Sequence, residues 1–294
     1  MQKIIPHLWY DTQAVEAANW YVSIFEHSKI NRVNQLHGTP SGDVDTVDFT
    51  LDGVDFFAIS AGQFFKLNSA TSLMVTCRSA EEVDRLYEKL GEGSSTMMPL
   101  GAYPFSKRYV WFADKFGLNW QLCYFETDEI SQKIRPVLLF GAEACGQADE
   151  ALRFYQSVFP DTVPGYVNHY LPGEARDPRA KTNYAELTLL GHQFVAMDHG
   201  VGGDETFNEA FSFLVLCDTQ EEIDYYWEKL SSVPEAEQCG WLKDKFGVSW
   251  QIAPRVLNEM LDAATSEEAA RITQAFLGMK KLDIRALEAA KLGK

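Results

Sequence analysis

The chain has 294 residues, of which 46% are hydrophobic and 23% charged, and this ordinary globular composition allows about one to three domains. With 26 Lys and Arg residues against 42 Asp and Glu residues, the formal charge at pH 7 is 26 − 42 = −16. Nucleic acid and anionic membrane surfaces are therefore poor partners for this chain, because both are bound through clustered Lys and Arg.

Neither a targeting segment nor a disulfide framework is expected. The first residues contain too few apolar side chains for a secretory signal, and no apolar run reaches the roughly 18 residues that a membrane span requires. The cysteines are odd in number and form no CxxC pair, which favours free thiols over disulfides or a zinc site. We therefore expect a cytoplasmic protein. The five cysteines are Cys77, Cys123, Cys145, Cys217 and Cys239.

The first 60 residues predict a strand, a helix and three further strands. Ala17, Tyr21 and Ile24 recur at the three- and four-residue spacing of an amphipathic helix. Asp52-Gly53 stands between two alternating runs and indicates a β-hairpin. In chain order, the expected elements are a strand at 4–10, a helix around 17–24, and strands near 29–36, 46–51 and 54–60.

The same order then begins again. Ser79 and Glu82 form the spacing of a capping box, which predicts the start of a second helix. The expected elements are a strand at 73–77, this helix, and strands near 97, 109–113 and 118–124.

A phrase of ten residues occurs twice and indicates that the chain is duplicated. Residues 113–122 read Ala-Asp-Lys-Phe-Gly-Leu-Asn-Trp-Gln-Leu, and residues 243–252 read Lys-Asp-Lys-Phe-Gly-Val-Ser-Trp-Gln-Ile. In both copies a glycine lets the chain reverse before an alternating strand. Because the similarity extends along both halves, we expect an α+β fold with four βαβββ units.

The duplication divides the chain into three parts. Residues 1–128 form a first module, residues 133–254 form a second, and residues 255–294 form a helical tail. We expect the tail to dock on one module or on a second subunit.

Two connections differ between the halves. The segment 169–182 is longer than its counterpart in the first half. Conversely, the first half is longer between Leu90 and Trp111 than the second is between Leu230 and Trp241. Loops tolerate such changes and often carry function.

These patterns resemble the vicinal oxygen chelate superfamily of glyoxalases, bleomycin resistance proteins and dioxygenases, and more closely its PhnB-like branch. The resemblance covers about residues 3–254 and implies two glyoxalase-like modules in tandem. The motifs that carry it are Pro6-His7-Leu8-Trp9-Tyr10, Ala17-Ala18-Asn19-Trp20-Tyr21 and Ile24-Phe25 in the first half, and residues 239–247 with Ser249-Trp250-Gln251-Ile252 in the second.

Members of this branch are sometimes labelled 3-demethylubiquinone-9 3-methyltransferase domains, but the residues do not support methyl transfer. A methyl-donor site needs a glycine-rich turn between a strand and a helix. The one candidate, Gly200-Val-Gly-Gly, is followed by Asp204-Glu-Thr-Phe, which is not typical of a helix start.

Catalytic members of the superfamily hold a divalent metal in a cup formed by paired units, through His or Glu of the first and last strands. The resemblance places His7 and Gln121 at such positions in the first half, and Val137 and Gln251 in the second. A catalytic metal normally needs about three protein ligands, and a neutral amide adds no charge. We therefore expect no metal and no other cofactor, with His7 as the one candidate metal ligand.

Polar and aromatic residues of these strands are candidates for binding a small molecule. Alternation places His7 and Trp9 on one face of the first strand, and Asn119 and Gln121 on one face of the last strand. Gln251 repeats the position of Gln121. Trp120 is expected on the opposite face, under the helices.

A further polar group borders the glycine loop of the second half. Asp198 and His199 close the strand before this loop, and His192 begins the same strand. Together these three residues are candidates for a small polar site.

Three functions remain open. The first, which we favour, is binding of a small organic molecule in apolar, aromatic cups without a metal. The second is a metal-dependent lyase, isomerase or dioxygenase of the glyoxalase type, built around His7. The third is a structural role in which the halves form an internal pseudo-dimer, or two chains a homodimer. The sequence determines neither the ligand nor whether units are exchanged between the halves.

Overall fold

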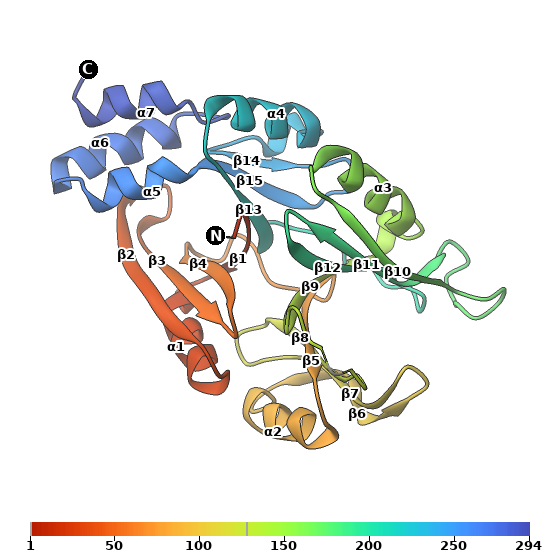
Figure 1. Ribbon diagram of the computed structural model, residues 1–294. Coiled ribbons are helices and arrows are strands. Elements are labelled where there is room, and N and C mark those ends of the chain that lie inside the picture. Colours follow the sequence, from red (N-terminus) through yellow and green to blue (C-terminus); the bar gives the residue numbers. More distant parts are fainter. Residues whose placement is uncertain (1, 128) are drawn as a thin grey trace.

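The computed structural model describes residues 2–127 and 129–294, which form two β-sheets with helices packed on their outer faces (Figure 1). Sheet A has seven strands, in spatial order β14 (Trp241–Lys243), β15 (Ser249–Pro254), β13 (Phe211–Cys217), β1 (Ile4–Tyr10), β4 (Val54–Ser60), β3 (Gly42–Leu51) and β2 (Lys29–Thr39). Sheet B has eight, in the order β10 (Val163–His169), β11 (Thr182–Leu189), β12 (His192–Asp198), β9 (Ile134–Phe140), β5 (Thr71–Cys77), β8 (Asn119–Tyr124), β7 (Ser106–Ala113) and β6 (Ser95–Tyr103). The helices of the units are α1 (Ala14–Ile24), α2 (Ala80–Leu90), α3 (Ala148–Val158) and α4 (Gln220–Leu230).

The chain exchanges its units between the two sheets. The first unit, β1 to β4, pairs with the fourth, β13 to β15, because β1 lies antiparallel to β13 in sheet A. The second unit, β5 to β8, pairs with the third, β9 to β12, because β5 lies antiparallel to β9 in sheet B. Each sheet therefore takes one unit from each half, and the halves cannot separate without breaking both sheets.

The fourth unit lacks a strand that the sequence analysis expected. Between α4 and β14 the chain forms only a short 3₁₀ turn, Pro234–Ala236, where the second unit forms β6 and the hairpin to β7. Strand β14 is itself only three residues long. The connection between Leu230 and Trp241 is too short for another strand, and Pro234 has no backbone N–H to offer to a sheet.

The repeated ten-residue phrase is held by its buried aspartate. The carboxylate of Asp114 accepts hydrogen bonds from the backbone N–H groups of Phe116 (2.8 Å) and Leu118 (3.1 Å), from Trp120 Nε1 (2.8 Å) and from the Tyr21 hydroxyl (2.8 Å). These bonds join the turn and the last strand of the second unit to helix α1 of the first unit.

Asp244 repeats the arrangement in the second half. Its carboxylate accepts hydrogen bonds from four donors, which are the backbone N–H groups of Phe246 and Val248, Trp250 Nε1 and the Tyr155 hydroxyl of α3. The turns close through Gly117 and Gly247, which adopt φ values of +88° and +87° that favour glycine. Burial raises the pKa of Asp114, and it raises the pKa of Asp244 to about 6.

The apolar core lies between the helices and the outer faces of the sheets. Trp120 is fully buried there and stacks on Phe25 with ring centroids 5.4 Å apart, which confirms its expected place under the helices. Trp250 is its counterpart beside Phe159 in the second half. The opposite faces, turned away from α1 to α4, are named cup A on sheet A and cup B on sheet B.

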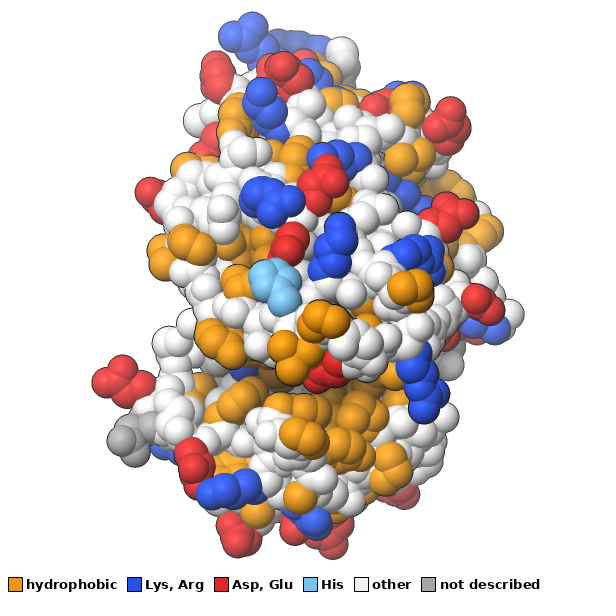
Figure 2. All heavy atoms as spheres, turned by 90° about the vertical axis from the view of Figure 1, so that its right-hand side faces the viewer, with side chains coloured by type: hydrophobic (Ala, Val, Ile, Leu, Met, Phe, Trp, Pro, Cys, Tyr) orange, Lys and Arg blue, Asp and Glu red, His pale blue; other side chains and the backbone are white. Residues whose placement is uncertain are grey.

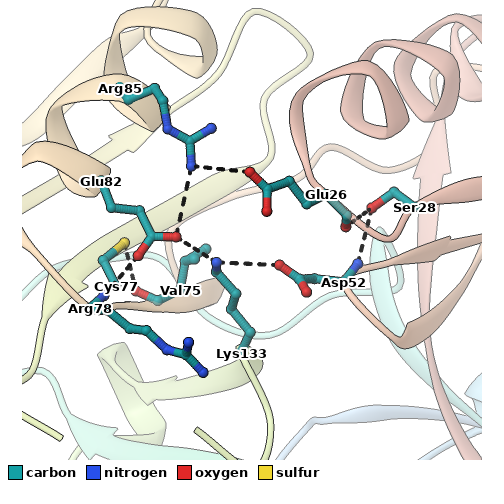
Figure 3. A network of polar contacts seen from close by, with 9 residues as sticks. All are labelled: Glu26, Ser28, Asp52, Val75, Cys77, Arg78, Glu82, Arg85 and Lys133. Carbon is teal, nitrogen blue, oxygen red and sulfur yellow. Dashed lines mark hydrogen bonds and ion pairs between the residues drawn. The ribbon is translucent and has the colours of Figure 1, made fainter. Parts of the chain in front are cut away.

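Two lysines tie the paired units together at the starts of β1 and β9. Lys133 Nζ lies 2.5 Å from Glu82 Oε1 of α2 and 3.4 Å from Asp52 Oδ2 of the β3–β4 turn (Figure 3). At the equivalent position, Lys3 Nζ lies 2.7 Å from Glu222 Oε1 of α4. The Lys133 network borders a polar cavity of about 480 Å³, and its charges are already paired within the protein.

The tail forms three helices after β15, in agreement with the helical tail expected from the sequence. These are α5 (Arg255–Asp262), α6 (Ser266–Leu277) and α7 (Ile284–Lys291). Thr265 and Glu268 form a complete capping box at the start of α6. Figure 1 shows the tail beside sheet A, between β2 and α4. None of the helices in residues 2–127 and 129–294 is both long and apolar enough to cross a membrane.

Candidate ligand-binding cups

In cup A, neutral polar side chains from three neighbouring strands form a row linked by polar contacts. His7 on β1 lies opposite Ser212 on β13, and its Nδ1 atom is 3.3 Å from Ser212 Oγ. Gln251 on β15 donates from Nε2 to the same hydroxyl oxygen over 2.9 Å. Aromatic rings flank His7: Phe57 stacks on it at 5.2 Å, and Trp241 meets it edge-on at 5.3 Å.

His7 is uncharged in this position. Its side chain is only 2% exposed, and burial lowers its pKa to about 3. It therefore offers hydrogen bonds and a ring face at neutral pH, but no positive charge.

Trp9 stands at the end of cup A, on the same face of β1 as His7. Its indole N–H donates to the Gly62 carbonyl oxygen over 2.8 Å, and its ring lies near Phe65 and Trp241. It borders a cavity of about 320 Å³ at the end of β1. The structure thus brings His7, Trp9 and Gln251 into one neighbourhood.

Asn119 and Gln121 lie in the other cup. Gln121 Nε2 donates to Ser72 Oγ over 2.9 Å, and the Tyr109 hydroxyl donates to Gln121 Oε1 over 2.7 Å. Asn119 accepts from Trp111 Nε1 over 3.2 Å. Both side chains are about as buried as His7 and more buried than Trp9 and Gln251, and they are not in contact with His7, because β8 and β1 belong to different sheets.

Cup B also contains a buried arginine that the sequence analysis did not single out. Arg135 on β9 is 7% exposed, and its Nη1 atom donates to Glu186 Oε1 on β11 over 2.7 Å. Its Nη2 atom donates to Thr76 Oγ1 over 3.3 Å. The Nε atom is buried and has no hydrogen-bond partner. A charged residue inside the apolar run Ile134–Phe140 was the signal that could have found it.

Glu186 balances the charge of Arg135. Although burial opposes its ionisation, hydrogen bonds from the Tyr184 hydroxyl and from Arg135 lower the pKa of Glu186. The pair is therefore ionised at neutral pH and close to neutral in sum.

The mouth of cup B is open and apolar. Figure 2 shows a hollow in the lower half of the view whose rim and walls are largely hydrophobic. Buried Met74, Val137 and Val195 form the floor of the cup. Two exposed aromatic side chains border it: Tyr166 of β10 lies 6.4 Å from Tyr184, and Phe105 of the β6–β7 turn lies 4.9 Å from Tyr109, both between ring centroids.

Asp198, His199 and His192 do not form one site. His192 and Asp198 occupy opposite ends of β12. Both carboxylate oxygens of Asp198 accept hydrogen bonds from backbone N–H groups, those of Gly146, Ala148, Lys181 and Thr182. This residue therefore joins the start of α3 to the loop 170–181. His199 has a buried Nδ1 atom without a partner.

The residues at the superfamily's metal positions do not fit a divalent cation. Cup A offers His7, Ser212 and Gln251, whereas cup B offers only Ser72, Gln121 and Val137. Of these, only His7 is a side chain that such metals prefer. Within residues 2–127 and 129–294, no three His, Cys, Asp or Glu side chains are grouped so that they could hold a metal ion.

Known structures define the class of this fold. Glyoxalase I from Zea mays shares 10% sequence identity, with 88% of this chain and 96% of the maize protein covered and a TM-score of 0.56. A PhnB protein from Bacillus cereus shares 36% identity, with 42% of this chain and 100% of that chain covered and a TM-score of 0.40. A protein from Pseudomonas aeruginosa shares 20% identity over 42% of this chain and 98% of its own length, with a TM-score of 0.38. The similarity to the maize structure shows that the fold is glyoxalase-like.

The family follows from the sequence match. The family model described as 3-demethylubiquinone-9 3-methyltransferase matches residues 2–123 and again residues 132–253. The chain belongs to this family and contains its domain twice. No curated protein matches the chain.

Proposed function

We propose that the protein binds a small, uncharged organic molecule in cup B, without a metal ion. The observation that carries the proposal is the open, apolar hollow of cup B together with the buried Arg135, whose Nε–H group has no hydrogen-bond partner. An unpaired buried donor costs roughly 1–3 kcal/mol, which a ligand oxygen would recover once a small turn of the Arg135 side chain brings this group to the surface of the cup. Ligand sites commonly combine apolar walls with a few fixed polar groups of this kind.

The charges around cup B favour a neutral ligand. Arg135 is already paired with Glu186, so a carboxylate would meet little net positive charge. The overall charge of −16 also disfavours anions. Met74, Phe125, Tyr184 and the neighbouring apolar side chains suit an aromatic or aliphatic body that carries one carbonyl oxygen.

The alternative activities receive less support. A glyoxalase-type lyase, isomerase or dioxygenase needs a metal, and neither cup supplies enough suitable ligands. Methyl transfer is also not proposed, because the glycine loop at Gly200–Gly203 leads through irregular backbone to β13 and not into a helix.

Fluorescence titration with 6-propionyl-2-dimethylaminonaphthalene, an uncharged aromatic ketone, tests the proposal. We expect saturable binding with a blue-shifted emission. Arg135→Lys keeps a positive charge beside Glu186 but removes the Nε–H group, and it should weaken binding by about tenfold. Arg108→Lys, in the exposed Arg–Asp pair with Asp84 of α2, is the matched control and should leave binding unchanged.

Three results would overturn the proposal. One is the absence of saturable binding, and another is equal binding by the Arg135→Lys and wild-type proteins. The third is tighter binding of the anion 8-anilinonaphthalene-1-sulfonate, which would exclude a preference for neutral molecules.

Metal analysis after separate exposure to manganese, iron, nickel and zinc should find no tightly bound ion. One ion per chain would instead support the metal-dependent alternative.

We further propose that the protein is cytoplasmic, since all five cysteines are free thiols and burial raises the pKa of each above the ordinary value. A fluorescent fusion found outside the cytoplasm would contradict this location.

A further inference from the structure

The C-terminal tail touches both edges of sheet A. Strand β2 forms one edge of this sheet and β14 forms the other. Helix α6 lies along β2, while the segment between α6 and α7 passes the residues that precede β14. The tail therefore spans the open side of the sheet, as Figure 1 shows.

The attachment near β14 is firm. The backbone N–H groups of Cys239 and Gly240 donate to the carbonyl oxygens of Met279 (2.7 Å) and Lys280 (2.8 Å). Leu282 is fully buried, and Ile284 packs against the main core. Backbone hydrogen bonds and apolar burial act together here, so this end has the properties of an anchor.

The attachment near β2 is made of side chains that water reaches. The Arg32 guanidinium is bound both to Asp48 on β3 and to Asp262 on α5. The side chains of Arg32 and Asp262 are 26% and 48% exposed. Gln274 Nε2 donates to the Gly38 carbonyl oxygen over 3.2 Å. Exposed polar contacts of this kind contribute little stability, so this end can open more easily than the other.

The tail has a core of its own. Met260, Ile272 and Leu287 form an apolar cluster that is separate from the main core. The three helices can therefore keep their mutual packing while their contact with β2 is broken.

The polar interior of cup A lies on the side of the sheet that the tail spans. Besides His7, Ser212 and Gln251, it contains Ser249, whose hydroxyl oxygen is buried without a hydrogen-bond partner. By contrast, edge strand β10 of sheet B, which has no tail beside it, is exposed along its entire length, whereas β2 alternates between exposed and half-buried residues.

We propose that helices α5 to α7 form a hinged cover that opens at the β2 edge and controls access to cup A, with the Arg32–Asp262 ion pair as its latch. This goes beyond ligand binding in cup B and does not depend on it.

The test measures the access of reagent to His7 in the full-length protein. Diethylpyrocarbonate modifies neutral imidazoles, and the rate at His7 is followed by peptide mass spectrometry. In the wild type His7 should react slowly. In Asp262→Asn, which keeps the shape but removes the charge, the rate should rise about two- to five-fold. High salt should raise the wild-type rate in the same direction, because it screens the exposed pair.

Two references separate opening of the cover from general loosening. His27, which is exposed between α1 and β2, should react at the same rate in all samples. Asp84→Asn breaks an equivalent exposed pair with Arg108 on the sheet B side and should leave His7 unchanged. The proposal is overturned if His7 reacts equally in Asp262→Asn and wild type and is insensitive to salt. An equal increase in Asp84→Asn would also overturn it.

Discussion

Cup A and cup B are built from equivalent strands, yet the tail spans one and leaves the other open. Both pair the first strands of two units antiparallel at the centre of the sheet, and both place a serine and a glutamine at matching positions, Ser212 with Gln251 and Ser72 with Gln121. A chain with two similar halves has only one C-terminus, so only one sheet has a tail beside it.

The position of one arginine in each sheet reflects this difference. Asp48 on β3 and Glu186 on β11 occupy equivalent positions, and each pairs with an arginine. Arg32 comes from the edge strand β2 and reaches out to the tail. Arg135 comes from the central strand β9 and points into the cup. Both sheets thus have an acidic residue at the same position. The strand that supplies the arginine decides whether the ion pair reaches the tail or lies inside the cup.

The largest expected effect concerns the two buried aspartates that join units of different sheets. Asp114→Ala and Asp244→Ala each remove a carboxylate that accepts four hydrogen bonds and leave buried donors unpaired. We expect each to lower the free energy of unfolding by about 3–5 kcal/mol, measured by denaturant titration. The exposed Asp84→Ala should cost less than about 1 kcal/mol. If only one of the two substitutions lowered the free energy of unfolding, the buried aspartates would not have equivalent roles in the two halves.

An acid response should distinguish cup A from cup B. His7 has a pKa of about 3 when folded, below its ordinary 6.5, so the unfolded chain gains a proton first as the pH falls. This loss of stability begins near pH 6.5 and is complete near pH 3. Between pH 7 and 5 the wild type should lose about 2 kcal/mol more than His7→Gln. Cup B has Val137 at this position and makes no such contribution. Equal losses in both proteins would contradict the neutral state of His7.

The smallest effect concerns the two lysine ties. The side chains of Lys133 and Glu82 are 20% and 15% exposed, whereas those of Lys3 and Glu222 are 28% and 35% exposed. Lys133→Met should therefore destabilise the protein by about 1 kcal/mol and Lys3→Met by less, measured by denaturant unfolding. Lys107→Met, in a more exposed pair with Glu126, serves as the control and should have no measurable effect. A larger loss at Lys3 would reverse this ranking.

Most local elements could be predicted from short stretches of sequence. Alternation located the strands, three- and four-residue spacing located the helices, and Ser79 and the Asp-Lys-Phe-Gly turns marked boundaries between elements. The missing strand of the fourth unit was not predicted, because similarity to the second unit outweighed two signals against it, the short connection between Leu230 and Trp241 and Pro234 within it.

The sequence could predict that the candidate residues face the inside of a cup, but it could not predict which of them lie in the same cup. His7, Trp9 and Gln251 share cup A, whereas Asn119 and Gln121 belong to cup B, because the units are exchanged. The sequence analysis did not single out Arg135, although a charged residue in an apolar strand was a signal; its burial and its pairing with Glu186 are given only by the structure.

The sequence by itself determined the duplication, the order of most elements and the faces of the first and last strands, because these depend on local periodicity and turn chemistry. Only the tertiary structure decided which unit pairs with which, where Arg135 leaves an unpaired N–H group, and which cup the tail spans. Strand pairing and helix docking join residues far apart in the chain, and similar halves offer similar edges, so local patterns cannot choose between the pairings.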